Sequence, residues 1–343
     1  MAERGWVFRR LCTARPIGGS LRRFTSLNIC AGAGGMAIGL EAAGFDPVML
    51  FDEDTDACAT LRINRPTWDV REYDLFEFIG NDHPQVLDVD LFAGAPPRVP
   101  YSVAGNRRAV ERTRDPFRAA VWLAAEIQPK AILLDNVPAL VKEDAFRGER
   151  DFIRDELGNC GYEVEWVVLD AQRFGVPQRR PHGLIVGMAP EHLARFSWPV
   201  GNDHGAPTVG DVLRKSMASR GWPGAEEWGR QANEIAPTIV GGAKGRGGAD
   251  LGPSRTKDIW ARLCVNGASV ADQPPGPDHI VDPNDRKTFP KLTVEQAADL
   301  QGFPAEWSFS GRKTSRFRQV GHAVPPALAE AVGKSIAVAL ATA

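Results

Sequence analysis

The stretch Val89-Asp-Leu-Phe-Ala-Gly-Ala-Pro-Pro-Arg98, which continues as Val99-Pro-Tyr-Ser102, decides how this chain is expected to fold. Its first four residues form a short apolar run that predicts a buried parallel strand, and the Gly/Pro-rich residues after it predict a loop. In an open α/β sheet, ligands bind at the carboxyl ends of the strands. We therefore expect this loop, with Arg98 at its centre, to lie in the functional site.

The composition is that of a soluble globular protein. The chain has 343 residues, 43% hydrophobic and 24% charged, which is enough for one large domain or two smaller ones. No uninterrupted apolar run approaches the roughly 20 residues that span a bilayer. The formal charge of -2 argues against a uniformly basic surface, so any DNA-binding face has to be a local patch.

Cysteine usage and the amino-terminal residues indicate the compartment. The five cysteines lack the paired spacing of zinc ligands, and no secretory signal is evident, so we expect reduced thiols, a cytoplasmic location and no metal site. Residues 1–25 form an arginine-rich extension that is nearly free of acids. An organellar transit peptide fits this composition weakly, and a disordered basic extension or an over-long start is favoured.

A glycine turn follows the first predicted strand. Ser26-Leu-Asn-Ile-Cys30 is apolar, and Ala31-Gly32-Ala-Gly34-Gly35 turns it into a helix that runs through Leu40. Glycines let a backbone approach a ligand closely, and a helix N-terminus offers unpaired N–H groups. By itself such a turn is weak evidence and could bind any nucleotide.

Two acids follow at the ends of the next segments. The strand Pro47-Val-Met-Leu-Phe51 ends in Asp52, and an acid in this place is the usual partner of ribose hydroxyls, although a helix-capping role is the alternative. Asp74 ends a third short segment. It could accept a hydrogen bond from an adenine amino group, or it could cap the following turn.

Further segments carry polar residues at predicted loops and strand ends. The arginine-rich stretch that includes Arg107 and Arg108 predicts a mobile loop over the site, or otherwise a solvated surface loop. A strand over 131–134 leads to Asp135-Asn136-Val137, and a strand over 164–169 leads to Phe174-Gly-Val-Pro-Gln178-Arg179-Arg180-Pro181-His182. His182 receives no role, because a lone histidine at the start of a strand is more often structural than catalytic.

The composition changes after residue 188. The stretch to residue 287 is rich in Gly, Pro and Trp, lacks βα alternation, and contains Gly241-Gly-Ala-Lys244-Gly-Arg246-Gly-Gly248. Basic glycine-rich loops can follow phosphates, although a flexible linker is the alternative. The tryptophans of this stretch, Trp222, Trp228 and Trp260, argue for a core of its own.

These motifs, in this order, closely resemble those of the DNA cytosine-5 methyltransferases. The resemblance is most specific in Leu292-Thr-Val-Glu-Gln-Ala-Ala-Asp-Leu-Gln301-Gly-Phe-Pro304 and in Gln319-Val-Gly-His322-Ala323-Val-Pro-Pro326. It implies an α/β, doubly wound, mostly parallel sheet of the class I, Rossmann-like methyltransferase type, with a smaller irregular target-recognition domain. It also implies S-adenosylmethionine as cofactor, double-stranded DNA as partner, and a restriction-modification setting.

The resemblance also implies a division of the chain. Residues 26–188 would form the S-adenosylmethionine-binding domain, residues 189–288 the target-recognition region, and residues 289–343 the return of the chain that completes the first domain. The cofactor would be bound by Ala31, Gly32, Gly34, Gly35, Asp52, Asp74 and Ala323, and DNA by Arg107, Arg108, Gln178, Lys244 and Arg246.

Four positions depart from the family pattern. Arg98 stands where the family has its nucleophilic cysteine, in a loop that there reads Pro-Cys. Asp135, which keeps the carboxylate that binds N3 of the flipped cytosine, replaces a glutamate and is shorter by one methylene. Arg180 matches one of the arginines that hold the base, whereas His182 replaces the last arginine and His322 replaces an asparagine.

The change at Arg98 bears directly on the chemistry. C5 of cytosine is a poor nucleophile, and the family activates it by adding a thiolate to C6. A guanidinium stays protonated and has no lone pair to offer. Three interpretations stay open: a catalytically silent protein that still binds DNA, cofactor or a partner subunit of a modification or defence complex; an enzyme of altered chemistry; and an ordinary methyltransferase with an artificial change at Arg98. The first is favoured, with Arg98 expected to pair with Asp135 across the base pocket.

Overall fold

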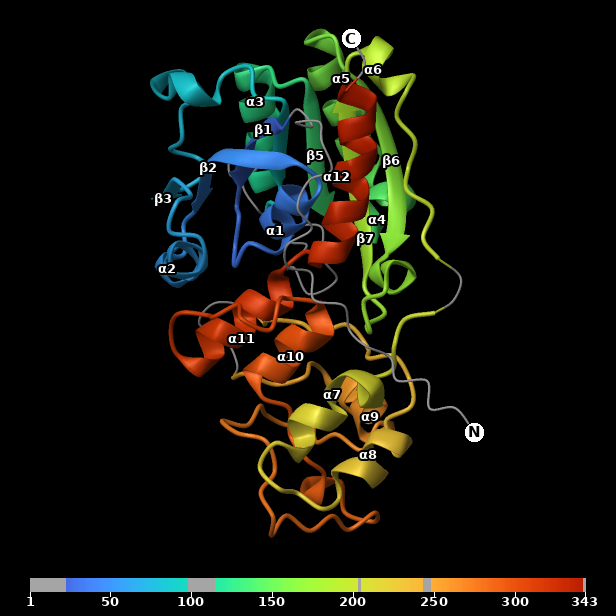
Figure 1. Ribbon diagram of the computed structural model, residues 1–343. Helices are drawn as coiled ribbons and strands as arrows, with labels where there is room; N and C mark the ends of the chain where they lie inside the picture. The colour runs from blue at the N-terminus through green and yellow to red at the C-terminus, as the bar shows by residue number, and fades with distance from the viewer. Residues whose placement is uncertain (1–22, 98–114, 203–204, 243–247, 342–343) are drawn as a thin grey trace, which may run out of the picture.

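The computed structural model describes residues 23–97, 115–202, 205–242 and 248–341 (Figure 1). A seven-stranded sheet forms the upper part of the molecule, and its order is β3-β2-β1-β4-β5-β7-β6. Only β7 runs against its neighbours. The predicted doubly wound, mostly parallel sheet is therefore confirmed. The strands are β1 (Phe24–Ile29), β2 (Phe45–Asp52), β3 (Val70–Glu72), β4 (Leu91–Gly94), β5 (Ala131–Asn136), β6 (Glu163–Asp170) and β7 (Pro181–Met188).

The strand order reverses between β1 and β4. The chain steps outward from β1 through β2 to β3 and then returns to lay β4 on the other side of β1. A reversal of this kind opens a crevice at the carboxyl ends of the two central strands. The predicted glycine turn follows β1, and the loop that leads to Arg98 follows β4, so both emerge at this crevice.

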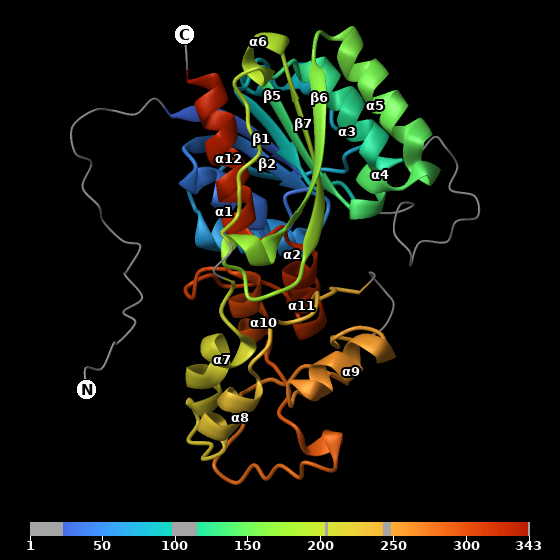
Figure 2. The ribbon, with the colours of Figure 1, turned by 90° about the vertical axis from the view of Figure 1, so that its right-hand side faces the viewer.

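Helices cover both faces of the sheet (Figure 2). One face carries α1 (Gly35–Ala42) and α12 (Pro326–Leu340), and the other carries α3 (Pro116–Ile127), α4 (Pro138–Lys142) and α5 (Arg147–Asn159). Successive strand residues alternate between two cores: Leu91 packs with α1 and α12, whereas Phe92 packs with α3 and α5. This two-sided burial explains why the central strands are apolar without a polar alternation.

Helix α12 comes from the end of the chain and lies directly on α1. Gly39 permits this approach, because a Cβ at that position would collide with the carbonyl of Pro326. One apolar helical stretch, 313–340, is long enough to cross a membrane, but 61% of its most apolar window is buried inside the protein. It comprises α11 (Lys313–His322) and α12, and the apolar face of α12 belongs to the core under the sheet.

The lower part of the molecule is helical in the described residues, with no strand. It contains α7 (Val209–Ala218), α8 (Ala225–Gln231) and α9 (Ser254–Arg262), joined by irregular segments (Figure 1). As the sequence suggested, Trp222, Trp228 and Trp260 are buried there. The helices α10 (Val294–Gln301) and α11 lie between this lobe and the sheet, and only α12 of the carboxyl-terminal segment covers the sheet itself.

The remaining elements are short or peripheral. Helix α2 (Thr55–Asn64) follows β2, and α6 (Pro190–Leu193) follows β7. Single 3-10 turns are η1 (Gly80–Asp82), η2 (Pro84–Val86), η4 (Asp144–Phe146), η5 (Ala171–Phe174) and η6 (Arg286–Thr288). The basic extension predicted for residues 1–25 lies almost wholly outside the described residues and stays a prediction.

The contact between α1 and α12 yields a stability prediction. Gly39→Ala is expected to lower the free energy of unfolding by about 1–3 kcal/mol, because the added methyl group overpacks the helix interface. Gly158→Ala is the matched control: it lies in α5 with nothing within 4 Å of the new Cβ, and it should leave stability unchanged or raise it by about 0.5 kcal/mol. Urea unfolding of the two variants measures the difference. Equal effects would contradict the packing described.

Candidate functional site

The glycine turn after β1 has the geometry of a ligand-binding loop. Gly32 and Gly34 adopt left-handed backbone conformations, with φ of 54° and 89°. Gly34 lies against the side chains of Leu61 and Trp307, and Gly35 lies beside Ala323, whose Cβ would be 3.1 Å from a Cβ at Gly35. The indole N–H of Trp307 donates to the carbonyl of Ala33 at 3.1 Å. The structure thus brings Ala323, from the far end of the chain, to the predicted cofactor loop.

Asp52 closes this turn. Its carboxylate accepts hydrogen bonds from the backbone N–H of Gly32 and of Asp54, both at 2.8 Å. Burial raises the pKa of Asp52, and the two backbone hydrogen bonds oppose that shift. Both carboxylate oxygens therefore have structural partners, which the prediction of a ribose-binding role did not foresee.

Glu53 is a further acid at this strand end, to which the sequence interpretation assigned no role. It follows directly after β2, at the same edge of the sheet, and its side chain is exposed. Because successive residues at a strand end point to opposite sides, Asp52 and Glu53 cannot both face the turn. Three consecutive acids, Asp52-Glu53-Asp54, follow one another in the sequence, and the sequence does not show which of them faces the crevice.

Asp74 has the capping role that was one of the two considered for it. Its Oδ1 accepts from the N–H of Phe76 at 2.9 Å, which is the capping interaction. The residue is only partly buried, and it stands beside a cluster of rings in which Phe51 stacks on Phe78 at 4.4 Å between centroids. The cap is therefore observed, and an adenine contact stays a prediction.

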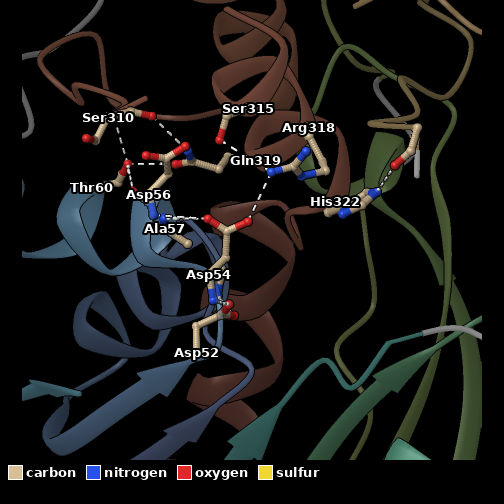
Figure 3. Close-up of polar contacts among 12 residues, drawn as sticks. Asp52, Asp54, Asp56, Ala57, Thr60, Ser310, Ser315, Arg318, Gln319 and His322 are labelled. Carbon is tan, nitrogen blue, oxygen red and sulfur yellow. Dashed lines mark hydrogen bonds and ion pairs between the residues drawn. The ribbon is translucent and has the colours of Figure 1, made fainter. Parts of the chain in front are cut away.

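Helix α11 connects the cofactor loop to the lower lobe (Figure 3). Asp54 caps α2 and forms an ion pair with Arg318 of α11 at 3.0 Å, and both side chains are largely buried. At the end of the same helix, Nε2 of His322 lies 2.9 Å from the carbonyl of Gly242. The segment that enters the glycine-rich stretch 243–247 is thus attached to the helix that contacts the cofactor loop.

The residues predicted to surround the base follow the ends of β4 and β5. Gly94, the last residue of β4, pairs with Leu134 of β5, so the loop that begins at Ala95 leaves the sheet beside Asp135. A Cβ at Gly94 would collide with Ile29, so glycine is required where the loop starts. Five predicted residues lie outside the described residues: Arg98, Arg107, Arg108, Lys244 and Arg246.

Asp135 has a described partner that the sequence interpretation left out. Nδ1 of His182 lies 2.6 Å from Oδ1 of Asp135, and both side chains are completely buried. Because a carboxylate only accepts hydrogen bonds, Nδ1 carries the hydrogen and donates it. A histidine at the start of a strand does not by itself indicate a role. Its position beside an acid at the end of the neighbouring strand would have indicated the pair.

Gln178 and Arg180, predicted to contact DNA and base, instead form a buried network. The guanidinium of Arg180 donates to the carbonyls of Ile239 at 2.6 Å, Gly321 at 2.7 Å and Ala323 at 3.0 Å. The amide of Gln178 donates to Gln301 at 2.7 Å and accepts from the N–H of Ile239 at 2.7 Å. Gln178 is 0% and Arg180 2% exposed. The described partners of both polar groups lie inside the protein, and the predicted contacts with DNA and base stay predictions.

Cys30 and Cys58 are poor nucleophiles. Burial, with the nearby charge of Asp52, raises the pKa of Cys58 to about 12 and raises the pKa of Cys30 well above its ordinary value. All four described cysteines are free thiols. No cluster of His, Cys, Asp or Glu able to hold a metal ion occurs in the part of the chain that the structure describes.

Comparisons with known proteins agree with this architecture. The family model described as C-5 cytosine-specific DNA methylase matches residues 24–338. The chain is 46% identical over 315 residues to the Type II methyltransferase M.NaeI of Lentzea aerocolonigenes, covering 92% of this chain and 75% of that protein. It is 40% identical over 324 residues to the Type II methyltransferase M.NgoMIV of Neisseria gonorrhoeae, covering 93% and 98%.

Solved structures show the same fold at low sequence identity. The methyltransferase EhMeth of Entamoeba histolytica superposes with a TM-score of 0.63 at 12% identity, covering 92% of this chain and 98% of that one. A mutant of the Spodoptera frugiperda protein DNMT2 gives a TM-score of 0.61 at 12% identity, covering 91% and 99%.

The Arg180 network predicts a loss of stability that needs no DNA. Arg180→Met should lower the free energy of unfolding by about 3 kcal/mol or more, because buried carbonyls lose charged donors. Arg179→Met, at the exposed neighbouring position, is the control and should change it by less than about 0.5 kcal/mol. Urea unfolding measures both. If Arg180→Met were as stable as the parent, the network would not hold the segments together.

The thiols give a pH prediction. Iodoacetamide should modify Cys30 and Cys58 far more slowly in the folded protein than in urea between pH 7 and 9, because the neutral thiol predominates.

The raised pKa values of these two thiols also affect the stability of the protein. The unfolded chain releases these protons above the ordinary thiol pKa of 9.0, so the free energy of unfolding should fall as pH rises past that value. Mass spectrometry of the labelled sites checks the first result, and denaturation at pH 8 and 10 checks the second.

Proposed function

Because this chain belongs to the C-5 cytosine-specific DNA methylase family, we propose that it binds S-adenosylmethionine and duplex DNA but is impaired in C5 methyl transfer. The observation that carries the proposal is Arg98, at the position of the nucleophile in the loop that leaves β4 beside Asp135. S-adenosylmethionine is the methyl donor of this family.

The described residues fit this cofactor. Gly32 and Gly34 keep the turn free of side chains, and the N-terminus of α1 follows it. In our proposal Glu53 holds the ribose hydroxyls, because Asp52 is engaged by the turn, and Asp74 receives the adenine amino group. Ala323 forms the opposite wall beside Gly35. The cofactor supplies an electrophilic methyl group; this chain orients it towards the base pocket.

What the chain lacks is a group that can add to C6 of cytosine and leave again. Covalent catalysis of this kind requires an activated nucleophile, and a guanidinium remains protonated at every physiological pH. The raised pKa values of Cys30 and Cys58 keep those thiols neutral, and both lie on the cofactor side of the crevice. Neither thiol therefore substitutes for the missing one.

The proposal predicts separate outcomes for binding and catalysis. The natural chain should bind S-adenosylhomocysteine in calorimetry and retain duplex DNA at low salt, with retention that falls steeply as salt rises because phosphate contacts release counterions. With tritiated cofactor and mixed-sequence DNA it should transfer no methyl groups above background. Arg98→Cys should gain at least about 100-fold, because it restores the covalent path.

Arg98→Ser is the matched control, since it has nearly the size of cysteine but no thiolate. It should bind cofactor and DNA as Arg98→Cys does and stay inactive. C5 methylation by the natural chain would overturn the proposal, as would failure to bind the cofactor at millimolar concentration.

A further inference from the structure

The Asp135–His182 contact joins the end of β5 to the start of β7. Asp135 ends β5 and His182 begins β7, and the antiparallel register places Asp135 opposite Leu184, two residues from His182. Gly183 lets the chain after β5 pass very close, because a Cβ there would be 2.6 Å from the carbonyl oxygen of Val137. The backbone on both sides of the pair is therefore fixed.

Burial makes the contact necessary for both residues. A carboxylate removed from water needs hydrogen-bond donors, and the N–H of His182 at 2.6 Å is such a donor. The bond also restricts the torsion of the Asp135 side chain, so it sets the direction in which the carboxylate points. A carboxylate that binds the edge of a base must be held within a fraction of an ångström of its productive position.

We propose that His182 is the positioning residue of Asp135, and that the two act as a matched pair in the base pocket. This inference rests on the proposed function, in which Asp135 faces the flipped base. Asp135 stands where the family pattern has the longer glutamate, and His182 stands where it has the longer arginine. The 2.6 Å contact between the two completely buried side chains shows that these two replacements fit each other.

This view changes what a single reversion does. If Asp135 were merely too short, Asp135→Glu would bring its carboxylate nearer to the base. In the paired arrangement the added methylene instead pushes the carboxylate into the imidazole, which has no room to retreat because it is completely buried. His182→Arg alone inserts a longer side chain against an acid placed for histidine. Only the double exchange restores a fitting pair.

The test is a double-mutant cycle over Asp135→Glu and His182→Arg, measured in two backgrounds. In the natural chain, urea unfolding should show that each single exchange lowers the unfolding midpoint and that the double exchange recovers at least half of the loss. In the Arg98→Cys background, methyl transfer to mixed-sequence DNA should show kcat about 100-fold lower for each single exchange, as for a misplaced catalytic group, with KM for the cofactor unchanged. The double exchange should recover kcat.

Asp90→Glu with Lys130→Arg, a comparable double exchange in an ion pair, is the control. Asp90 accepts from Lys130 at 2.6 Å at the opposite end of the sheet, so these exchanges should leave kcat unchanged. Additive stability effects at Asp135 and His182 would overturn the pairing. The positioning role would be overturned if the stability effects were coupled but the single exchanges left kcat unaffected. It would also be overturned if no protein of the Arg98→Cys set transferred methyl groups. Loss of cofactor and DNA binding by the natural chain would instead overturn the proposed function.

Discussion

The buried guanidinium of Arg180 is the interaction on which the arrangement of this protein depends. It donates to the carbonyl of Ile239 in the segment between α8 and α9. It also donates to the carbonyls of Gly321 and Ala323, at the junction of α11 and α12. Segments distant in sequence therefore meet on one side chain. A planar group with several fixed donors can satisfy such a set, whereas the single ammonium of a lysine cannot.

The cofactor loop and the base pocket share this frame. The carbonyl of Ala323 accepts from both Arg180 and Gln301, and Ala323 packs against Gly35 of the glycine turn. Two residues after Arg180, at the start of β7, His182 contacts Asp135. A shift of the hairpin between β6 and β7 would thus move the wall of the cofactor loop and the carboxylate of the base pocket together. This explains why buried polar residues are concentrated here rather than at the opposite end of the sheet.

Much of this could be predicted from the sequence, because strand ends and glycine turns leave local signals. The turn after β1, the strands β4 and β5, and the buried tryptophans of the lower lobe were all evident in the residue pattern, although both strands run two residues further than the pattern indicated. The hydrogen-bond partners of Asp52, Gln178 and Arg180 could not be predicted, because they depend on which way each side chain faces after distant segments have packed. Adjacent acids such as Asp52 and Glu53 read alike in sequence, although one closes the turn and the other is exposed.

The departures from the family pattern are physically of two kinds. Asp135 and His182 contact each other at 2.6 Å inside the protein, so these two changes fit together in the packed interior. Arg98 is different, because no change elsewhere can give a guanidinium the lone pair that covalent attack requires. A substitution at only one of Asp135 and His182 would leave the other buried side chain without a fitting partner, and this would destabilise the folded protein. The fit between these two side chains agrees with our proposal that the chain keeps a base pocket although Arg98 occupies the position of the nucleophile.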